Sequence, residues 1–151
     1  MSASRPLRFA TMLLASGALL GAVVQPATAA DSHAPRSAVK IGHVQYDSPG
    51  WDTRSNRSLN AEWVEVRNTG RKPVRLNGWT LTDREGNRYR FRQLWLRGHD
   101  SVRVHTGIGR DTRHHVYQNR RHYVWDNRDA ATLRNDRGRW IDTKSWGRSG
   151  R

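Results

Sequence analysis

The sequence predicts an all-β domain built as a sandwich of short strands, and three features of the chain indicate it. From Val39 onward, apolar and polar residues alternate in short runs, which is the period of a half-buried strand. Clusters of Gly, Asn and Asp separate these runs, as tight turns require. No window of helical length carries an apolar stripe with the 3.6-residue period of a helix. We therefore expect each strand to bury one face in a shared core.

The residues before this domain have the layout of a secretory signal peptide. Arg5 and Arg8 give a positive start, and an uncharged stretch follows from Phe9 to Val24. The small residues Ala27-Thr28-Ala29 suit a signal peptidase, so cleavage is expected directly after them or one residue later. The uncharged stretch is shorter than the roughly 20 residues that span a bilayer, which makes a membrane anchor the weaker alternative.

This layout predicts a secreted or cell-envelope-associated protein with no transmembrane segment after signal removal. We divide the chain into a signal peptide (1–30), a flexible leader (31–38), a β-sandwich domain (39–147) and a tail (148–151). The domain is long enough to bury a core of its own. The chain contains no cysteine, which rules out disulfides, redox chemistry and thiolate metal sites.

The chain is strongly basic, with 27 Lys and Arg against 13 Asp and Glu. Loss of Arg5 and Arg8 with the signal peptide lowers the formal net charge from +14 to +12. Such a charge attracts polyanions, among them nucleic acid, anionic lipid and acidic cell-envelope polymers. Almost all of these cations are arginines, whose forks suit phosphate and carboxylate groups, although a genome-wide codon bias would leave the same mark.

The first half of the domain contains the clearest strand of the chain, Glu62–Asn68, in which Val64 and Val66 share one face. A first strand is expected at Val39–Tyr46, followed by a loop that includes the polar segment Ser55–Asn60. Alternating apolar pairs predict further short strands, with their members at Val74 and Leu76, Leu94 and Leu96, and Val102 and Val104.

A hairpin is expected in the middle of the domain. Trp79, Leu81 and Asp83 share one face of its first strand. The segment Asp83–Gly86 supplies an Asp that opens a turn and a Gly where positive φ is needed. The returning strand carries Tyr89 and Phe91, one on each side of Arg90.

The last third of the chain begins with its one long loop, Gly107–Arg121. Two short strands, Tyr123–Trp125 and Ala130–Leu133, are expected after it. Asn135–Gly138 repeats the turn chemistry of the first hairpin, and Trp140 and Ile141 return the chain. The total of seven to nine short strands at this spacing is typical of an immunoglobulin-like β-sandwich.

Five segments, taken in order, resemble the lamin tail domain as it occurs in exported bacterial proteins. They are EWVEVRNTG (62–70), LNGWTLTDREG (76–86), YRF (89–91), VRVHTGIG (102–109) and VWDNRDAATLRNDRGRWID (124–142). The resemblance covers about residues 39–146 and implies the same immunoglobulin-like sandwich, used as a binding or structural module rather than an enzyme. It also implies that Asn68 satisfies backbone groups at a strand end. Two departures are Arg128 before Asp129, where the family commonly has Gly, and Arg97 before Gly98, where it often has Pro.

The best candidate site is a run of cations interleaved with aromatic residues in and after the long loop. Such a run can bind phosphates and stack single-stranded bases, with strong salt dependence. The alternative is a basic loop whose charge only keeps it soluble. The candidate polyanion-binding residues are Arg110, Arg113, His114, His115, Arg120, Arg121, His122, Tyr117 and Tyr123.

No residue pattern indicates catalysis, a cofactor or a metal. The loop histidines suggest a metal-dependent nuclease, but His114 and His115 are adjacent on an extended segment and should point apart, with no paired carboxylates beside them. A nucleophile motif of the Gly-x-Ser-x-Gly type is absent. Glu62 and Glu65 face opposite ways on a strand and cannot act as a glycosidase pair.

Three functions stay open at the level of sequence. The first is a non-enzymatic exported module that binds an anionic polymer (nucleic acid or an acidic cell-wall polymer) or a protein partner. The second is a carbohydrate- or cell-wall-binding module that uses exposed tryptophans, although at least five of the seven tryptophans are expected to pack in the core or on strand faces. The third is the small metal-dependent nuclease.

Overall fold

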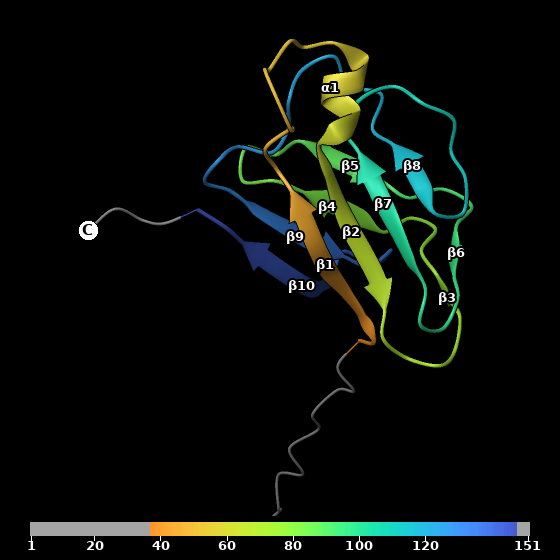
Figure 1. Ribbon diagram of the computed structural model, residues 1–151. Helices are drawn as coiled ribbons and strands as arrows, with labels where there is room; N and C mark the ends of the chain where they lie inside the picture. Colours follow the sequence, from red (N-terminus) through yellow and green to blue (C-terminus); the bar gives the residue numbers. More distant parts are fainter. Residues whose placement is uncertain (1–36, 148–151) are drawn as a thin grey trace, which may run out of the picture. The chain divides into compact units, whose positions relative to one another are not determined.

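The computed structural model describes residues 37–147, which belong to one compact unit and form a β-sandwich (Figure 1). The predicted signal peptide, most of the predicted leader and the tail lie outside the described residues. The elements are β1 (Val39–Gln45), α1 (Asn56–Ala61), β2 (Trp63–Asn68), β3 (Val74–Arg75), β4 (Thr80–Thr82), β5 (Arg88–Arg90), β6 (Trp95–Leu96), β7 (Ser101–His105), β8 (His115–Tyr117), β9 (Ala130–Arg134) and β10 (Trp140–Ser145). No helix among the described residues is long and apolar enough to cross a bilayer.

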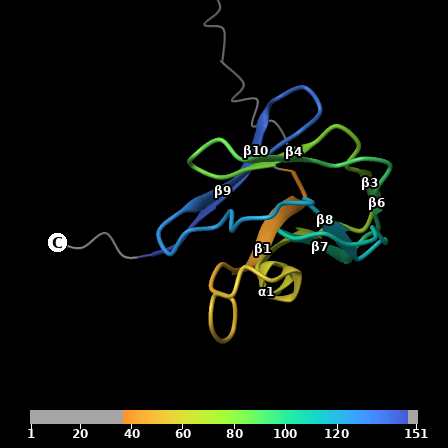
Figure 2. The same ribbon diagram turned by 90° about the horizontal axis from the view of Figure 1, so that it is seen from above.

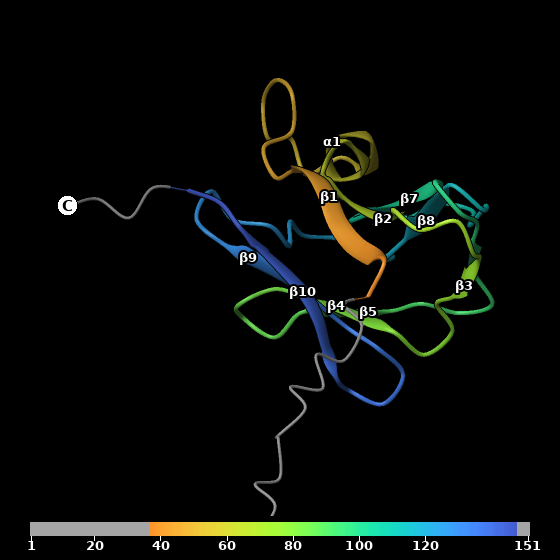
Figure 3. The ribbon, with the colours of Figure 1, turned by 90° about the horizontal axis from the view of Figure 1, so that it is seen from below.

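The strands form two four-stranded sheets and a short ribbon. The first sheet has the order β1-β2-β7-β8, the second has the order β10-β9-β4-β5, and β3 pairs with β6. Every pair is antiparallel except β7 and β8, which run parallel. Seen along the layers, the two sheets lie face to face, with the β3-β6 ribbon at one side (Figures 2 and 3). The predicted all-β, immunoglobulin-like sandwich is confirmed.

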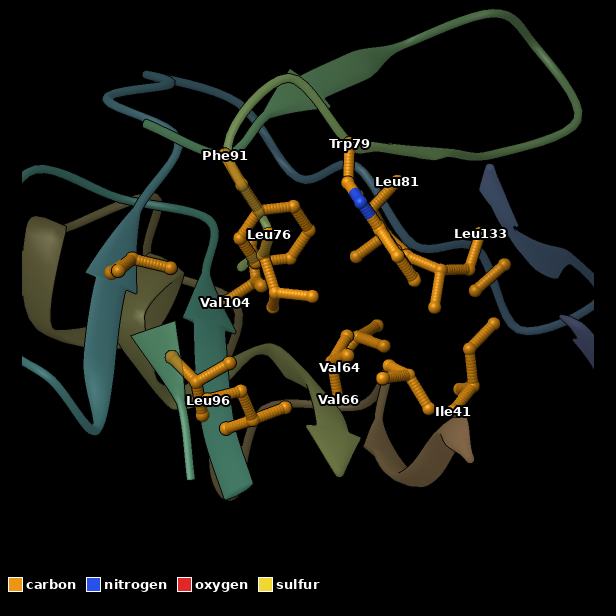
Figure 4. Packing of buried hydrophobic residues seen from close by; sticks show 14 of the residues in the cluster. Ile41, Val64, Val66, Leu76, Trp79, Leu81, Phe91, Leu96, Val104 and Leu133 are labelled. Carbon is orange, nitrogen blue, oxygen red and sulfur yellow. The ribbon is translucent and has the colours of Figure 1, made fainter. Parts of the chain in front are cut away.

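The core lies between the two sheets, and strand alternation determines which residues fill it. Val64 and Val66 of β2 are fully buried, as expected from their shared face. They pack in one cluster with Leu81 of β4, Leu133 of β9 and Phe91, which lies directly after β5 (Figure 4). Each fully buried aliphatic or aromatic side chain of this kind contributes roughly 1.5–3 kcal/mol to folding.

Both predicted hairpins are present, and each turn uses its glycine. In the β4–β5 hairpin, Asp83 Oδ1 accepts a hydrogen bond from the Asn87 N–H at 2.7 Å, and Gly86 has φ of 94°. In the β9–β10 hairpin, Gly138 has φ of 72°. A side chain at either glycine would be strained in this left-handed region.

The Asn68 side chain closes the end of β2. Its Nδ2 donates to the carbonyls of Lys72 at 2.7 Å and Leu96 at 3.2 Å, while its Oδ1 accepts from the Gly70 N–H at 3.0 Å. Asn68 is fully buried, and its amide therefore finds partners for both its nitrogen and its oxygen within the domain, among them the buried carbonyl of Leu96. The role implied by the family resemblance is therefore present in this chain.

Two short elements were missed because each is too short to carry a period. The segment Ser55–Asn60, predicted as loop, contains most of α1, a six-residue helix in which only Leu59 is buried. The helix begins where Ser55 Oγ accepts a hydrogen bond from the Ser58 N–H. The predicted loop Gly107–Arg121 contains β8, in which Val116 alone is fully buried. Tertiary pairing, not local pattern, stabilises both segments.

One predicted strand was wrong. Tyr123–Trp125 alternates like a strand but pairs with no other strand. The backbone N–H groups of Val124 and Trp125 instead donate to the carboxylate of Glu62. The described residues contain ten strands, more than the seven to nine expected, because the short strands are brought into pairs by contacts distant in sequence.

Candidate anion-binding site

The predicted polyanion-binding residues lie along the chain before, within and after β8, which is an edge strand of the first sheet. In this segment three of the four arginines and His122 are exposed, whereas Arg120, the remaining histidines and the tyrosines are partly buried. Before β8 lie Arg110, Arg113 and His114; within β8 lie His115 and Tyr117; after β8 lie Arg120, Arg121, His122 and Tyr123.

Hydrogen bonds hold the segment around β8 in a defined conformation. The Thr112 N–H donates to the His115 carbonyl at 2.7 Å, and the Tyr117 N–H donates to Asp111 Oδ1 at 2.9 Å. After β8, the Arg120 N–H donates to the Thr106 carbonyl at 3.0 Å. The cations of this segment therefore project from a folded backbone, which lowers the entropy lost when they bind a ligand.

The two tyrosines of the segment pack against the domain. The Tyr117 ring stacks on His105 with centroids 5.0 Å apart. It also lies so close to Gly109 that a Cβ there would fall 2.4 Å from the ring. The hydroxyl of Tyr123 lies 2.6 Å from Ser58 Oγ of α1. The stacking of bases on these two rings stays a prediction.

A pocket of about 740 Å³ opens between β6 and the segment that precedes β8. Figure 1 shows β6 and β8 on the same side of the domain. Buried Leu94 and Val116 contribute apolar surface, and the indole of Trp95, 58% exposed, stands at its side. The lining residues are Arg92, Gln93, Leu94, Trp95, Arg97, Asp100, Asp111, Thr112, Arg113 and Val116.

The arginines of this pocket form no ion pairs with other described residues, whereas its two carboxylates accept hydrogen bonds from the backbone. Within residues 37–147 the only ion pair joins His114 to Asp100, at 3.4 Å, so the pocket arginines have no carboxylate partner in this part of the chain. Asp100 and Asp111 each accept a backbone hydrogen bond, from the N–H groups of Ser101 and Tyr117. Three exposed guanidinium groups therefore outnumber the two carboxylates of the pocket and form no ion pair with them, which suits a bound anion.

Comparison with known families agrees with the fold. The family model described as Lamin Tail Domain matches residues 32–148. The chain belongs to the lamin tail domain family. The resemblance of the five sequence segments to the lamin tail domain is thereby confirmed. No curated protein was found to match the chain.

Sequence reasoning found only one of the three pocket arginines in this lamin tail domain. Arg113 belongs to the predicted set, whereas Arg92 and Arg97 were not predicted as site residues. At least five of the seven tryptophans were expected to pack in the core or on strand faces, whereas three of them, Trp51, Trp95 and Trp140, are exposed. The exposure of Trp95 could have been predicted from its position between Leu94 and Leu96. Since those two leucines face the core, alternation turns the indole outward.

Two histidines of this lamin tail domain, His105 and His115, form a hydrogen-bonded pair. His105 Nδ1 donates to the Asn60 carbonyl at 2.7 Å, because a carbonyl can only accept, and its Nε2 then accepts from His115 Nδ1 at 2.9 Å. His114 points away, toward the Ser101 carbonyl at 3.2 Å, as expected for adjacent side chains. Among residues 37–147 no three potential metal ligands lie together.

This pair makes stability depend on pH. Burial lowers the pKa of His105, and burial followed by the positive charge of Arg103 lowers the pKa of His115. Both folded pKa values lie below that of an unfolded histidine, about 6.5, so the unfolded chain binds protons first as the pH falls. The stabilisation is complete above about pH 6.5 and is lost as the pH drops from there to the lowered folded values.

We expect the melting temperature of the domain to fall by a few degrees between about pH 8 and pH 5.5. Calorimetry of the His105→Gln variant should show a weaker pH dependence, because one titrating partner is gone. The exposed His122→Gln variant serves as the control and should retain the wild-type dependence. An identical pH dependence in His105→Gln and wild type would show that the pair is not responsible.

Proposed function

We propose that this lamin tail domain is an exported, non-enzymatic module that binds an anionic polymer, either nucleic acid or an acidic cell-envelope polymer. The observation that carries the proposal is the pocket beside β6, where Arg92, Arg97 and Arg113 have no carboxylate partner among residues 37–147. The signal-peptide pattern supports export, and the family fold supports a role in binding.

An arginine pocket of this composition suits a phosphate or carboxylate group attached to an apolar or aromatic unit. The guanidinium forks can each donate two parallel hydrogen bonds to an oxyanion. The Trp95 indole and buried Leu94 offer apolar surface beside them. Exposed cations of the β8 segment, such as Arg110 and Arg121, extend the positive surface along a longer polymer.

The proposal is tested with residues 31–151, which include the whole compact unit that carries the core. This protein is titrated with DNA and with a neutral glycan at about 50 and 200 mM salt. We expect DNA binding at the lower salt that weakens at least tenfold at the higher salt, and no glycan binding. Absence of binding to DNA and to acidic cell-envelope polymers at the lower salt would contradict the proposal.

Exposed indoles favour one alternative, a carbohydrate-binding module. Trp51, Trp95 and Trp140 are 92%, 58% and 60% exposed. They come from the loop before α1, from β6 and from β10, which belong to different parts of the fold rather than to one strand face. Glycan binding that does not change with salt and is lost on Trp51→Ser would favour this alternative over the anionic polymer.

A further inference from the structure

The outer face of the second sheet carries a second set of arginines that lie far from the pocket in sequence. The strand register pairs Thr80 with Arg90 on one side and with Arg134 on the other, and Arg134 in turn pairs with Trp140. These four residues form one row across β5, β4, β9 and β10, the four strands of the sheet (Figure 3).

The row faces solvent. Leu81 and Leu133, the neighbours of Thr80 and Arg134 along their strands, are fully buried, so alternation turns the row outward. The next outward row is polar throughout, with its members at Arg88, Thr82, Thr132 and Thr143. We call the two rows together the arginine-threonine face.

An exposed indole is fixed on this face. Trp140 is 60% exposed, and its Nε1 donates to Thr143 Oγ1 at 2.9 Å. Thr143 Oγ1 also lies 3.2 Å from Thr132 Oγ1 on the same face. The indole N–H is therefore satisfied within the domain, and the ring is held over the sheet with its surface available for stacking.

The cations of the face have no partners of opposite charge in the described part of the chain. Arg88, Arg90 and Arg134 make no ion pair within residues 37–147. Together with Thr80 they line a hollow of about 320 Å³, and Asp136 is the one carboxylate among its lining residues. Arg134 also donates a hydrogen bond to the Gly138 carbonyl. An anionic partner complements this surface.

The predicted loop site reaches the same face. The Nη2 of Arg120 lies 3.4 Å from the carbonyl of Arg88 at the edge strand β5. A fourth guanidinium thus borders the arginine-threonine face. The segment after β8 and the second sheet can therefore contact one continuous polymer.

We propose that the arginine-threonine face binds single-stranded nucleic acid, with the arginines on phosphates and an unpaired base stacked on Trp140. This inference rests on the proposed function and names its polymer. Strands spaced about 4.8 Å apart place Arg90 and Arg134 roughly 10 Å apart, with Thr80 between them. A polyanion without rings cannot stack on the Trp140 indole, and in a duplex the base faces are covered by neighbouring base pairs. A single strand offers both phosphate charges for the arginines and exposed base rings for the indole.

The test compares variants for binding to single-stranded DNA of about 15 nucleotides, to the same sequence as a duplex, and to inorganic polyphosphate at about 50 mM salt. Trp140→Ser is expected to weaken single-strand binding about tenfold and to leave polyphosphate binding unchanged. Its matched control is Trp51→Ser, since Trp51 is 92% exposed in a loop. Melting temperatures establish that each variant is folded.

The arginines of the face are tested as a set. The triple variant R88S/R90S/R134S is expected to weaken both single-strand and polyphosphate binding more than R54S/R67S/R128S, which removes the same charge from exposed positions that do not line the hollow. Wild-type protein is expected to prefer the single strand to the duplex.

The outcomes separate this inference from the function on which it rests. If the wild type binds polyphosphate and DNA but Trp140→Ser behaves like Trp51→Ser, or if the duplex binds as tightly as the single strand, the arginine-threonine face is not a single-strand site. The module then remains a binder of anionic polymers in general. If the wild type binds no anionic polymer, the proposed function and this inference fall together.

Discussion

Replacing Glu62 by alanine is expected to lower the free energy of unfolding by about 3–5 kcal/mol, a large share of the stability of a domain this size. Glu62 is fully buried, and its Oε1 accepts three hydrogen bonds: from Thr106 Oγ1 at 2.7 Å and from the N–H groups of Val124 and Trp125 at 2.9 and 3.0 Å. Alanine leaves the two backbone donors without a partner away from water. Urea denaturation measures the loss.

Two variants separate the hydrogen bonds of Glu62 from its charge. Glu62→Gln keeps an acceptor oxygen for the same three donors, so it is expected to lose much less stability than the alanine variant. Burial raises the pKa of Glu62, so the stability that its protonated form contributes is lost as the pH rises through that raised value. This pH dependence should vanish in Glu62→Gln.

Glu65→Ala is the matched control for the same experiment. Glu65 is three positions along the chain, partly exposed, and accepts one backbone hydrogen bond from the His43 N–H at 3.0 Å. A loss below about 1 kcal/mol is expected. If Glu62→Ala were no more destabilised than Glu65→Ala, the buried carboxylate would not be what holds residues 124 and 125 in place.

Removing the three pocket arginines is expected to weaken DNA binding at about 50 mM salt by at least about 100-fold, because each charge-assisted hydrogen bond to a phosphate is worth roughly 1.5 kcal/mol or more. The variant is R92S/R97S/R113S. The slope of log affinity against log salt should become shallower by about 3, one for each phosphate that the variant no longer neutralises. Titrations followed by fluorescence anisotropy at several salt concentrations measure both quantities.

The control removes the same charge from exposed positions that line neither pocket, R54S/R67S/R128S, and should reduce affinity only through the general field of the domain. Equal losses in the two triple variants would mean that net charge, and not the pocket, determines binding. A larger loss in the pocket variant, with an unchanged melting temperature, supports the site.

The sandwich could be predicted because its long strands carry their own pattern. Val64 and Val66 alternate with polar residues and are buried together. Gly86 and Gly138 lie in the turns of the β4–β5 and β9–β10 hairpins, whose strands carry the expected apolar residues. α1 and β8 could not be predicted, because one buried residue each, Leu59 and Val116, gives no period. Tyr123–Trp125 was wrongly predicted as a strand, because the N–H groups of Val124 and Trp125 donate to the side chain of Glu62, which is distant in sequence, and not to another strand.

Only part of the candidate site could be predicted from the sequence. A run such as Arg110 to Arg121 is visible because its cations are neighbours along the chain. The pocket brings Arg92 and Arg97 beside Arg113 because β6 and its flanks lie next to the segment that precedes β8, and local composition does not show this. The row from Arg90 to Trp140 likewise depends on the register of three strand pairs. Proximity of this kind follows from topology rather than from spacing.

The most direct test of anionic-polymer binding is the affinity of residues 31–151 for inorganic polyphosphate across salt concentrations, because this probe carries charge without bases or sugars. Unpaired arginines predict measurable binding at about 50 mM salt, with log affinity falling linearly against log salt. Absence of binding at that salt concentration, or an affinity unchanged at about 200 mM, would contradict the role assigned to this lamin tail domain.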